Sequence, residues 1–118
     1  MRMITTPTQL EAAGTVPKSI FEYVGRMSGK NSISVARMVS PKGWSEPGQT
    51  PEFEEISLVL SGSLLVETRD GVVTLRAGQA CIASPGEWVR YSTPAEPAEY
   101  VAICTPAFQP EIVHRDGN

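Results

Sequence analysis

Residues Leu64–Leu75 read LLVETRDGVVTL and carry the clearest local signal for the fold. Two runs rich in Val, Leu and Thr flank the pair Asp70-Gly71. This arrangement predicts a β-hairpin whose two turn residues both adopt positive φ. Polar and apolar residues also alternate with a period of two upstream, as in Ser32–Val39. The sequence therefore predicts β-strands, and no helix longer than one turn.

Further short strands are expected on both sides of this hairpin, each ending at Gly or Pro. We expect them at Ile56–Leu60, Gln79–Ala83, Trp88–Ser92 and Glu99–Thr105, with Gly62, Gly78, Pro85-Gly86 and Pro94 as separators. Roughly seven to nine short strands in about 90 residues predict an antiparallel sandwich or barrel. We expect residues 1–18 to form an N-terminal arm, 19–105 the β-barrel, and 106–118 a tail that packs on the barrel or on a partner.

Composition sets limits on the class of protein. The 118 residues suffice for one domain, and 41% hydrophobic with 19% charged residues is ordinary globular composition. A net charge of −3 argues against a nucleic-acid surface, which normally needs a basic patch. No apolar run reaches the ~20 residues that span a bilayer, and the N-terminus lacks the apolar core of a signal peptide. We therefore expect a soluble, cytoplasmic protein that does not bind membranes.

Two segments around the hairpin carry a recognisable motif. Gly43–Gly62 reads GWSEPGQTPEFEEISLVLSG, and Gly78–Tyr91 reads GQACIASPGEWVRY. Glu55 precedes Gly62 by seven positions, and Gly86 follows Gly78 by eight. These spacings resemble the two conserved motifs of the cupin superfamily. The resemblance implies an all-β, antiparallel jelly-roll (RmlC-like) barrel with ligand-binding residues inside it, which pairs into a homodimer.

The metal-binding histidines of the cupin motif are missing. Laid onto the pattern, they fall on Gln49, Pro51 and Val89, so that only Glu55 of the ligand set remains. The chain contains a single histidine, whereas a three-histidine or facial-triad site needs two or three imidazoles. We therefore expect no metal site of this kind and no cofactor. Weak binding of a divalent cation by Glu52, Glu54 or Glu55 stays open.

Two cupin subfamilies resemble the chain more closely. Phe53–Gly62 and Tyr91–Pro94 are similar to segments of the EutQ-like ethanolamine-utilisation cupins. The tail around His114 resembles that of the ectoine synthases, whose metal-binding Tyr and His would fall on Cys81 and Val89. The resemblance implies a small single-domain cupin, without the iron-dependent cyclisation of the ectoine synthases.

Three residues are candidate catalytic groups. Glu55 inside a barrel would be desolvated, which raises its pKa and suits a general acid or base; the alternative is a structural hydrogen bond. Tyr91 shares a strand face with Val89 and offers a hydroxyl to the cavity, or else packs in the core. His114 is the only side chain with an ordinary pKa near neutrality, and its alternative is a surface position.

Other residues are candidates for ligand binding. Gln49 would hydrogen-bond a neutral ligand, and Arg37 would face inward and bind a carboxylate. Trp44 and Trp88 would form aromatic walls, or else cover the barrel mouth or a dimer contact. Cys81 lies in an apolar run, as does a second cysteine at position 104, and both are expected as buried, reduced thiols.

The acidic residues before the first motif glutamate have two interpretations. Glu46, Glu52 and Glu54 lie close together with no Lys or Arg between them. We interpret them as solvated loop charge. The alternative is an acidic mouth for a cationic ligand or a hard metal ion.

Two functions follow from these candidates. The first is an isomerase-, lyase- or cyclase-type enzyme that moves a proton on a small polar metabolite with Glu55, assisted by Tyr91 or His114. The second is a non-catalytic binding or accessory cupin that has lost its metal site. The sequence leaves both open and does not identify the ligand, since a fold hosts many functions.

Overall fold

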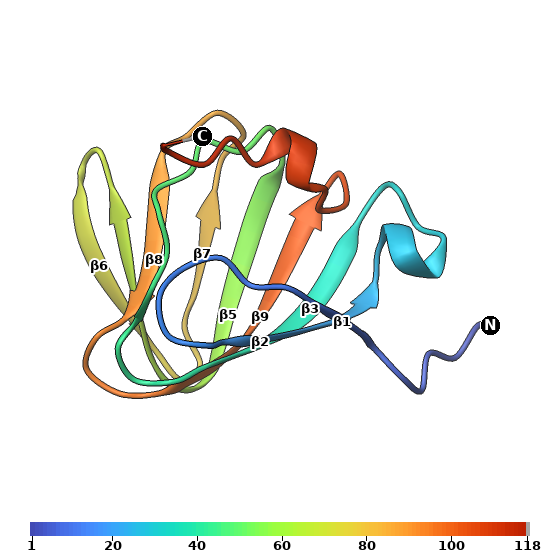
Figure 1. Ribbon diagram of the computed structural model, residues 1–118, viewed down its shortest axis with the longest axis horizontal. Helices are drawn as coiled ribbons and strands as arrows, with labels where there is room; N and C mark the ends of the chain where they lie inside the picture. The colour runs from blue at the N-terminus through green and yellow to red at the C-terminus, as the bar shows by residue number, and fades with distance from the viewer. Residues whose placement is uncertain (118) are drawn as a thin grey trace.

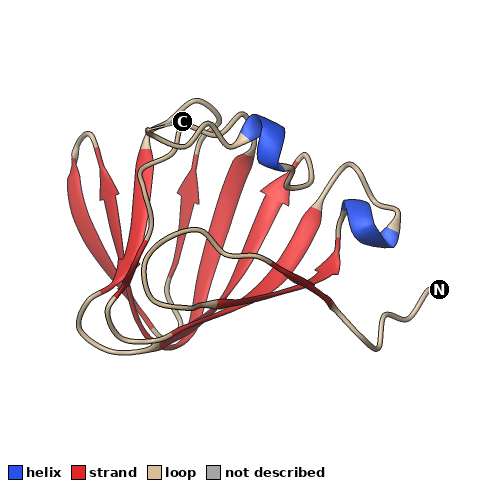
Figure 2. Ribbon diagram, in the orientation of Figure 1, coloured by secondary structure: helices blue, strands red, loops and turns tan. Residues whose placement is uncertain are grey.

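The computed structural model describes residues 1–117 as antiparallel strands with two one-turn 3-10 helices (Figures 1 and 2). The elements are β1 (Thr8–Leu10), β2 (Ser19–Val24), η1 (Arg26–Ser28), β3 (Ser34–Ser40), β4 (Trp44–Ser45), β5 (Glu54–Thr68), β6 (Gly71–Arg76), β7 (Ala80–Ala83), β8 (Val89–Thr93), β9 (Ala98–Thr105) and η2 (Pro110–Ile112). Within this range no helix has the length and apolar character needed to cross a membrane.

The strands form one curled antiparallel sheet in the order β1-β2-β3-β9-β5-β8-β4, and β6 and β7 also pair with β5. The long strand β5 joins two halves of this sheet. Its first half pairs with β7 and β9, whereas its second half pairs with β6 and β8. Figure 1 shows the strands curving around a common interior. The predicted all-β, single-domain jelly-roll barrel is confirmed.

The sequence suggests that Gly62 separates two strands, but this residue lies within β5. It adopts φ 75°, and the register against β9 shifts between Val59 and Ser61. A Cβ atom at position 62 would lie 1.8 Å from the carbonyl oxygen of Pro97. Only glycine combines this backbone conformation with this close approach. Gly62 therefore lets β5 continue from one half of the sheet into the other.

The hairpin between β5 and β6 is confirmed, but its predicted turn is wrong by one residue. Thr68 pairs with Gly71, so the two turn residues are Arg69 and Asp70. Neither of them has positive φ; only the following Gly71 does, at 138°. The Thr68 hydroxyl accepts a hydrogen bond from the Asp70 N–H at 3.2 Å, and this side-chain contact stabilises the turn.

Both terminal segments pack on the barrel. In the N-terminal segment β1 pairs with β2, and the Thr15 N–H donates to the Ser45 carbonyl at 2.9 Å. In the C-terminal segment, backbone hydrogen bonds join His114 to Thr50 and Ile112 to Glu52. The tail therefore covers one end of its own barrel, next to the loop that precedes β5 (Figure 1).

The strands that line the interior turn small and polar side chains inward. In β3 the inward residues include Ala36 and Met38, and in β5 they include Glu55 and Ser57. The larger apolar side chains of the same strands, such as Leu58, point outward and are partly exposed. Other apolar side chains, such as Val59 of β5, are fully buried, and a cavity that also contains polar groups remains at the centre of the barrel.

Candidate functional site

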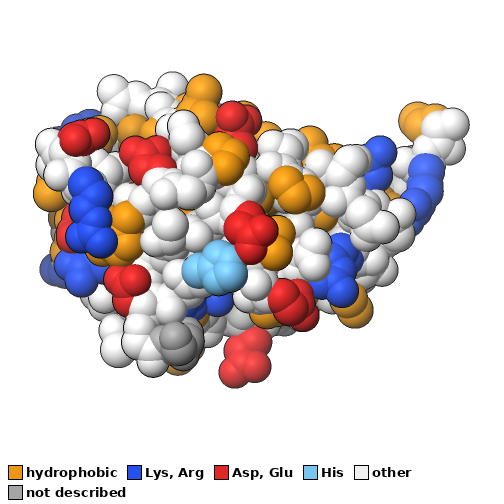
Figure 3. Space-filling view, turned by 90° about the horizontal axis from the view of Figure 1, so that it is seen from above, with side chains coloured by type: hydrophobic (Ala, Val, Ile, Leu, Met, Phe, Trp, Pro, Cys, Tyr) orange, Lys and Arg blue, Asp and Glu red, His pale blue; other side chains and the backbone are white. Residues whose placement is uncertain are grey.

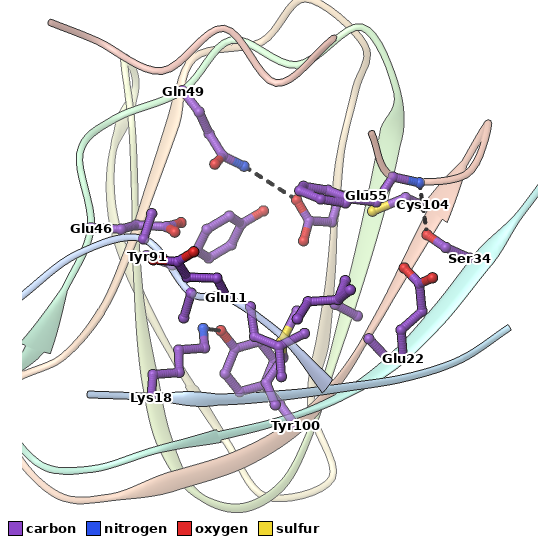
Figure 4. A pocket seen from close by; sticks show the side chains of 18 of the residues that line it. Glu11, Lys18, Glu22, Ser34, Glu46, Gln49, Glu55, Tyr91, Tyr100 and Cys104 are labelled. Carbon is purple, nitrogen blue, oxygen red and sulfur yellow. Dashed lines mark hydrogen bonds between the residues drawn. The ribbon is translucent and has the colours of Figure 1, made fainter. Parts of the chain in front are cut away.

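A cavity with a volume of about 60 Å³ occupies the centre of the barrel. Its walls combine apolar side chains with polar ones that come from the N-terminal arm, five strands, the loop before β5 and the C-terminal tail (Figure 4). The polar residues that matter most below are Lys18, Glu46, Gln49, Glu55, Tyr91 and Tyr100. A cavity with convergent polar groups in an apolar wall is the usual form of a small-molecule site.

Glu55 lies near the start of β5, opposite Cys104 of β9, and only 8% of its surface is exposed. The Gln49 side-chain amide donates a hydrogen bond to its Oε1 at 3.4 Å. Burial, and then the neighbouring Glu46 carboxylate, raise the pKa of Glu55 to about 7, although Lys18 and Arg115 oppose the shift. Near neutral pH Glu55 therefore exists in both protonation states, as a proton-transfer group must.

Glu46, which follows β4, is a second carboxyl group in the cavity. Burial raises its pKa to about 7, and Lys18 and Arg115 oppose this shift as well. The expectation that Glu46 is a solvated loop charge is wrong, because the loop between β4 and β5 folds against the barrel mouth. Glu52 does lie on the surface, and Glu54 is half-buried outside the cavity.

Among the described residues, Lys18 is one of two cationic groups that line the cavity, and no pattern in the sequence indicated it. It stands at the end of the predicted arm, yet its Nζ donates to the Tyr100 hydroxyl at 2.5 Å inside the barrel. Nζ also lies 3.5 Å from the centroid of the Trp44 ring. Burial lowers the pKa of Lys18 to about 8, while Glu46 and Glu55 favour its charged form.

Two tyrosines present hydroxyl groups to the cavity. Tyr91 projects inward from β8, where it both packs in the core and lines the cavity, and Tyr100 projects inward from β9. Burial raises the pKa of both well above the ordinary value, so that both are neutral hydroxyls near pH 7. The Tyr91 hydroxyl points toward Glu55 (Figure 4) and meets hydrogen-bond geometry with no residue of the described chain. Buried and partly exposed residues alternate along β9, with Tyr100 at a buried position. Strand periodicity could therefore have predicted an inward Tyr100, but this residue was not among the candidates.

The positions that correspond to the cupin metal ligands come together in space but do not fit a metal ion. Gln49 and Val89 exchange two backbone hydrogen bonds of 2.9 Å each. Val89 and Pro51 have no side-chain donor atom, and the Gln49 amide nitrogen faces Glu55. In the part of the chain that the structure describes, no three His, Cys, Asp or Glu residues are grouped to hold a metal. These residue types do not suit a transition metal, so no step below involves one.

Of the two tryptophans, only Trp44 lines the cavity. It is fully buried, and its indole N–H donates to the Ala13 carbonyl at 3.0 Å. Trp88, the second candidate for an aromatic wall, does not line the cavity. Its indole N–H donates to Asp116 at 2.8 Å outside the barrel, and Arg69 stacks on its ring at 4.3 Å.

The two cysteines, both expected to be buried, differ in their surroundings. Cys81 is half-buried, packs against the hydrophobic core and does not line the cavity, whereas the buried Cys104 does. Both are free thiols, as expected. The structure therefore does not place Cys81, a predicted ligand-binding residue, in the cavity lining, because β7 turns it against the core.

Two further candidates lie outside the cavity. Arg37 alternates with the inward Ala36 and Met38, so it faces outward and lies 3.9 Å from Glu99 and 4.8 Å from the Phe21 ring. The inward orientation expected for Arg37 is wrong. The single histidine, His114, lies on the outer surface (Figure 3), where its Nε2 is 2.6 Å from a carboxylate oxygen of the exposed Glu52. The structure therefore does not bring His114 to Glu55.

The tail supplies one cavity residue that the sequence analysis missed. Arg115 pairs with Gln49 through the backbone and lines the cavity. Its Nε is buried and has no hydrogen-bond partner among residues 1–117. No local pattern predicts this position, since it depends on how the tail folds back over the barrel end.

Solved structures similar to this chain share its fold. An RmlC-like cupin from Shewanella frigidimarina NCIMB 400 has a TM-score of 0.74 and 13% identity, over 90% of this chain and 89% of that one. The polyketide cyclase RemF from Streptomyces resistomycificus has a TM-score of 0.77 and 15% identity, over 100% and 85%. The protein has the cupin fold. The ethanolamine utilization protein Q (EutQ) of Salmonella typhimurium LT2 is a further cupin-fold neighbour, with a TM-score of 0.69 and 17% identity over 88% and 99%.

Sequence comparison adds one curated relative of this cupin-fold chain. The relative is the Endoribonuclease YbeY of Myxococcus xanthus, which is 40% identical over 101 residues. The match covers 84% of this chain but 34% of that protein, so the chain spans about a third of the relative's length. The relative's name describes the whole protein. No protein-family model matches the sequence.

Proposed function

We propose that this cupin-fold protein binds a small polar metabolite in the barrel and moves a proton on it with Glu55, without a histidine-held metal. The observation that carries the proposal is the position of the Glu55 carboxyl group, which is buried in a cavity beside Gln49 and faces the Tyr91 hydroxyl (Figure 4). A carboxyl group with a pKa of about 7 suits proton transfer at neutral pH.

The other polar groups of the cavity fit an isomerase-, lyase- or cyclase-type reaction. Glu46 supplies a second carboxyl group of similar pKa, so that one carboxyl can act as the acid while the other acts as the base. The neutral hydroxyls of Tyr91 and Tyr100 can donate to an oxygen that gains negative charge during the reaction. The small free volume favours a metabolite of few heavy atoms.

Isotope exchange tests this proposal across several classes of small metabolite at once. Small hydroxy acids, keto acids, aldehydes and amines are incubated with the protein in D₂O near neutral pH, and loss of C–H signals is followed by NMR. We expect exchange in at least one compound with the wild type and none above background with Glu55→Gln. The matched control is Glu54→Gln, which removes a neighbouring carboxyl outside the cavity. Equal exchange by the wild type and Glu55→Gln would contradict the proposal.

A second candidate function is non-catalytic binding of a small molecule. It is favoured by Gln49, Pro51 and Val89, which stand at the positions of the metal-binding histidines of the cupin motif and cannot replace them as metal ligands. A ligand that binds the folded state raises the melting temperature by mass action. For this function we expect a compound that stabilises the wild type and Glu55→Gln equally, while its C–H signals persist in D₂O. The predicted homodimer and cytoplasmic location stay predictions.

A further inference from the structure

Lys18 differs from the two other lysines of the chain in its surroundings. Lys30 and Lys42 are exposed, whereas the Lys18 amine lies within the barrel cavity. Its Nζ donates to the Tyr100 hydroxyl at 2.5 Å (Figure 4). Nζ also lies 3.5 Å from the centre of the Trp44 ring. The cavity thus presents one amine, held by a neutral hydroxyl group and an aromatic surface.

The ring faces of Trp44 and Tyr100 favour the charged form of Lys18, but no carboxylate of the described residues forms an ion pair with it. The carboxyl groups of Glu46 and Glu55 lie in the same cavity, beyond ion-pair distance, and they favour the charged form less than burial disfavours it. A lysine desolvated in this way provides a larger fraction of neutral amine, which is the nucleophilic form.

We propose that Lys18 forms an imine with a small aldehyde or ketone bound in the barrel. Three observations carry this proposal: the amine lies in the cavity, it lacks an ion-pair partner, and a carboxyl group that can carry protons lies nearby. The same cavity is too small for a large substrate, which restricts the carbonyl compound to a small one.

The chemistry balances with groups already in the cavity. The neutral Lys18 nitrogen adds to the carbonyl carbon, so that an N–C bond forms and the carbonyl oxygen becomes a hydroxyl group. That oxygen takes one proton originally on the amine and one from the Glu46 carboxyl, and it leaves as water when the C–O bond breaks. The products are a protonated imine, a Glu46 carboxylate and one water molecule. No oxidant or reductant is needed.

The proposal deepens the proposed function and gives Lys18 and Glu55 consecutive tasks. A protonated imine withdraws electrons from the adjacent carbon and makes its C–H bond more acidic. Glu55 would then remove this proton, and that later step rests on the proposed function. Imine formation itself does not require Glu55, so the two can be tested separately.

Reductive trapping tests the imine directly. The native protein is treated near pH 7.5 with formaldehyde or glycolaldehyde and cyanoborohydride, and modified lysines are identified by peptide mass spectrometry. Each trapped adduct adds the mass of the aldehyde less one oxygen. With a pKa of about 8, Lys18 has roughly a hundredfold more neutral amine than an ordinary lysine at this pH. We expect Lys18 to react at least tenfold faster than Lys30 and Lys42.

Controls separate reactivity due to the fold from trivial labelling. In urea the three lysines should react at similar rates, and Lys18→Arg, which keeps the positive charge, should abolish the fast phase. Glu55→Gln should retain fast trapping at Lys18, even where isotope exchange is lost. The proposal is overturned if Lys18 is labelled by both aldehydes no faster than Lys30 and Lys42 in the native protein. It is also overturned if Lys18 is still labelled faster than the other two lysines in urea. Fast trapping without isotope exchange would refute the role of Glu55 alone.

Discussion

Replacing Glu55 by glutamine removes one buried negative charge and keeps an oxygen that can accept the Gln49 hydrogen bond. In the folded protein the pKa of Glu55 is about 7, compared with an ordinary value of 4.5. Between these two pH values the folded state binds more protons than the unfolded state. The free energy of unfolding of the wild type therefore falls as the pH rises through this window.

The size of the effect follows from the pKa shift. Raising the pKa from 4.5 to about 7 corresponds to about 3 kcal/mol of lost stability once the carboxyl is fully ionised. Glu55→Gln lacks this loss. At pH 8 we expect the variant to be more stable than the wild type by about 3 kcal/mol, or roughly 10 °C in melting temperature for a chain of this length. At pH 4.5 the two proteins should have nearly equal stability.

Urea unfolding at a series of pH values measures this difference. Glu46 and Lys18 interact electrostatically with Glu55, so the difference between the two curves gives the contribution of Glu55 together with these interactions. The reasoning is refuted if the difference does not change with pH. It is also refuted if Glu55→Gln is the less stable protein at pH 8, because Glu55 would then be a structural anion.

Other substitutions separate the barrel's structure from its site. Gly62→Ala should lower the free energy of unfolding by about 3 kcal/mol, because its Cβ would collide with the Pro97 carbonyl. The control Gly86→Ala, at φ 81° in open space, should lower it by about 1 kcal/mol. Equal losses of stability in the two variants, measured by thermal or urea unfolding, would contradict this. Arg37→Ala should leave isotope exchange unchanged and alter the free energy of unfolding by less than about 1 kcal/mol, since the Arg37–Glu99 ion pair is exposed. Loss of isotope exchange in this variant would show that Arg37 contributes to the site. His114→Gln should also leave exchange unchanged, and a changed pH profile of exchange would show that it acts on the cavity.

The sequence predicted the fold because that information is local. Alternation and turn residues placed most strands within one or two residues, and the motif spacing indicated the jelly roll. Gly62 was misinterpreted as a strand end, since its role depends on the distant Pro97 carbonyl. The turn after Thr68 was wrong by one residue because a side-chain hydrogen bond stabilises a turn without positive φ.

The candidate site was only partly predictable. Glu55, Tyr91 and Gln49 lie on the two motif segments, and the resemblance to the cupin motifs implied that these segments carry residues facing the barrel interior. Lys18 and Arg115 come from terminal segments whose docking depends on tertiary contacts, so no local pattern identified them. Arg37 was misplaced for a different reason: β3 turns Ala36 and Met38 toward the cavity, so the residue between them faces outward.

The central claim is that Glu55 is a buried carboxyl that changes protonation near neutral pH, and an NMR titration tests it most directly. The side-chain carboxyl carbons of glutamate are observed from about pH 4 to pH 9, and the Glu55 signal is assigned by its absence in Glu55→Gln. The account predicts a midpoint near 7 for this signal. A midpoint near 4.5, the ordinary value for glutamate, would contradict it.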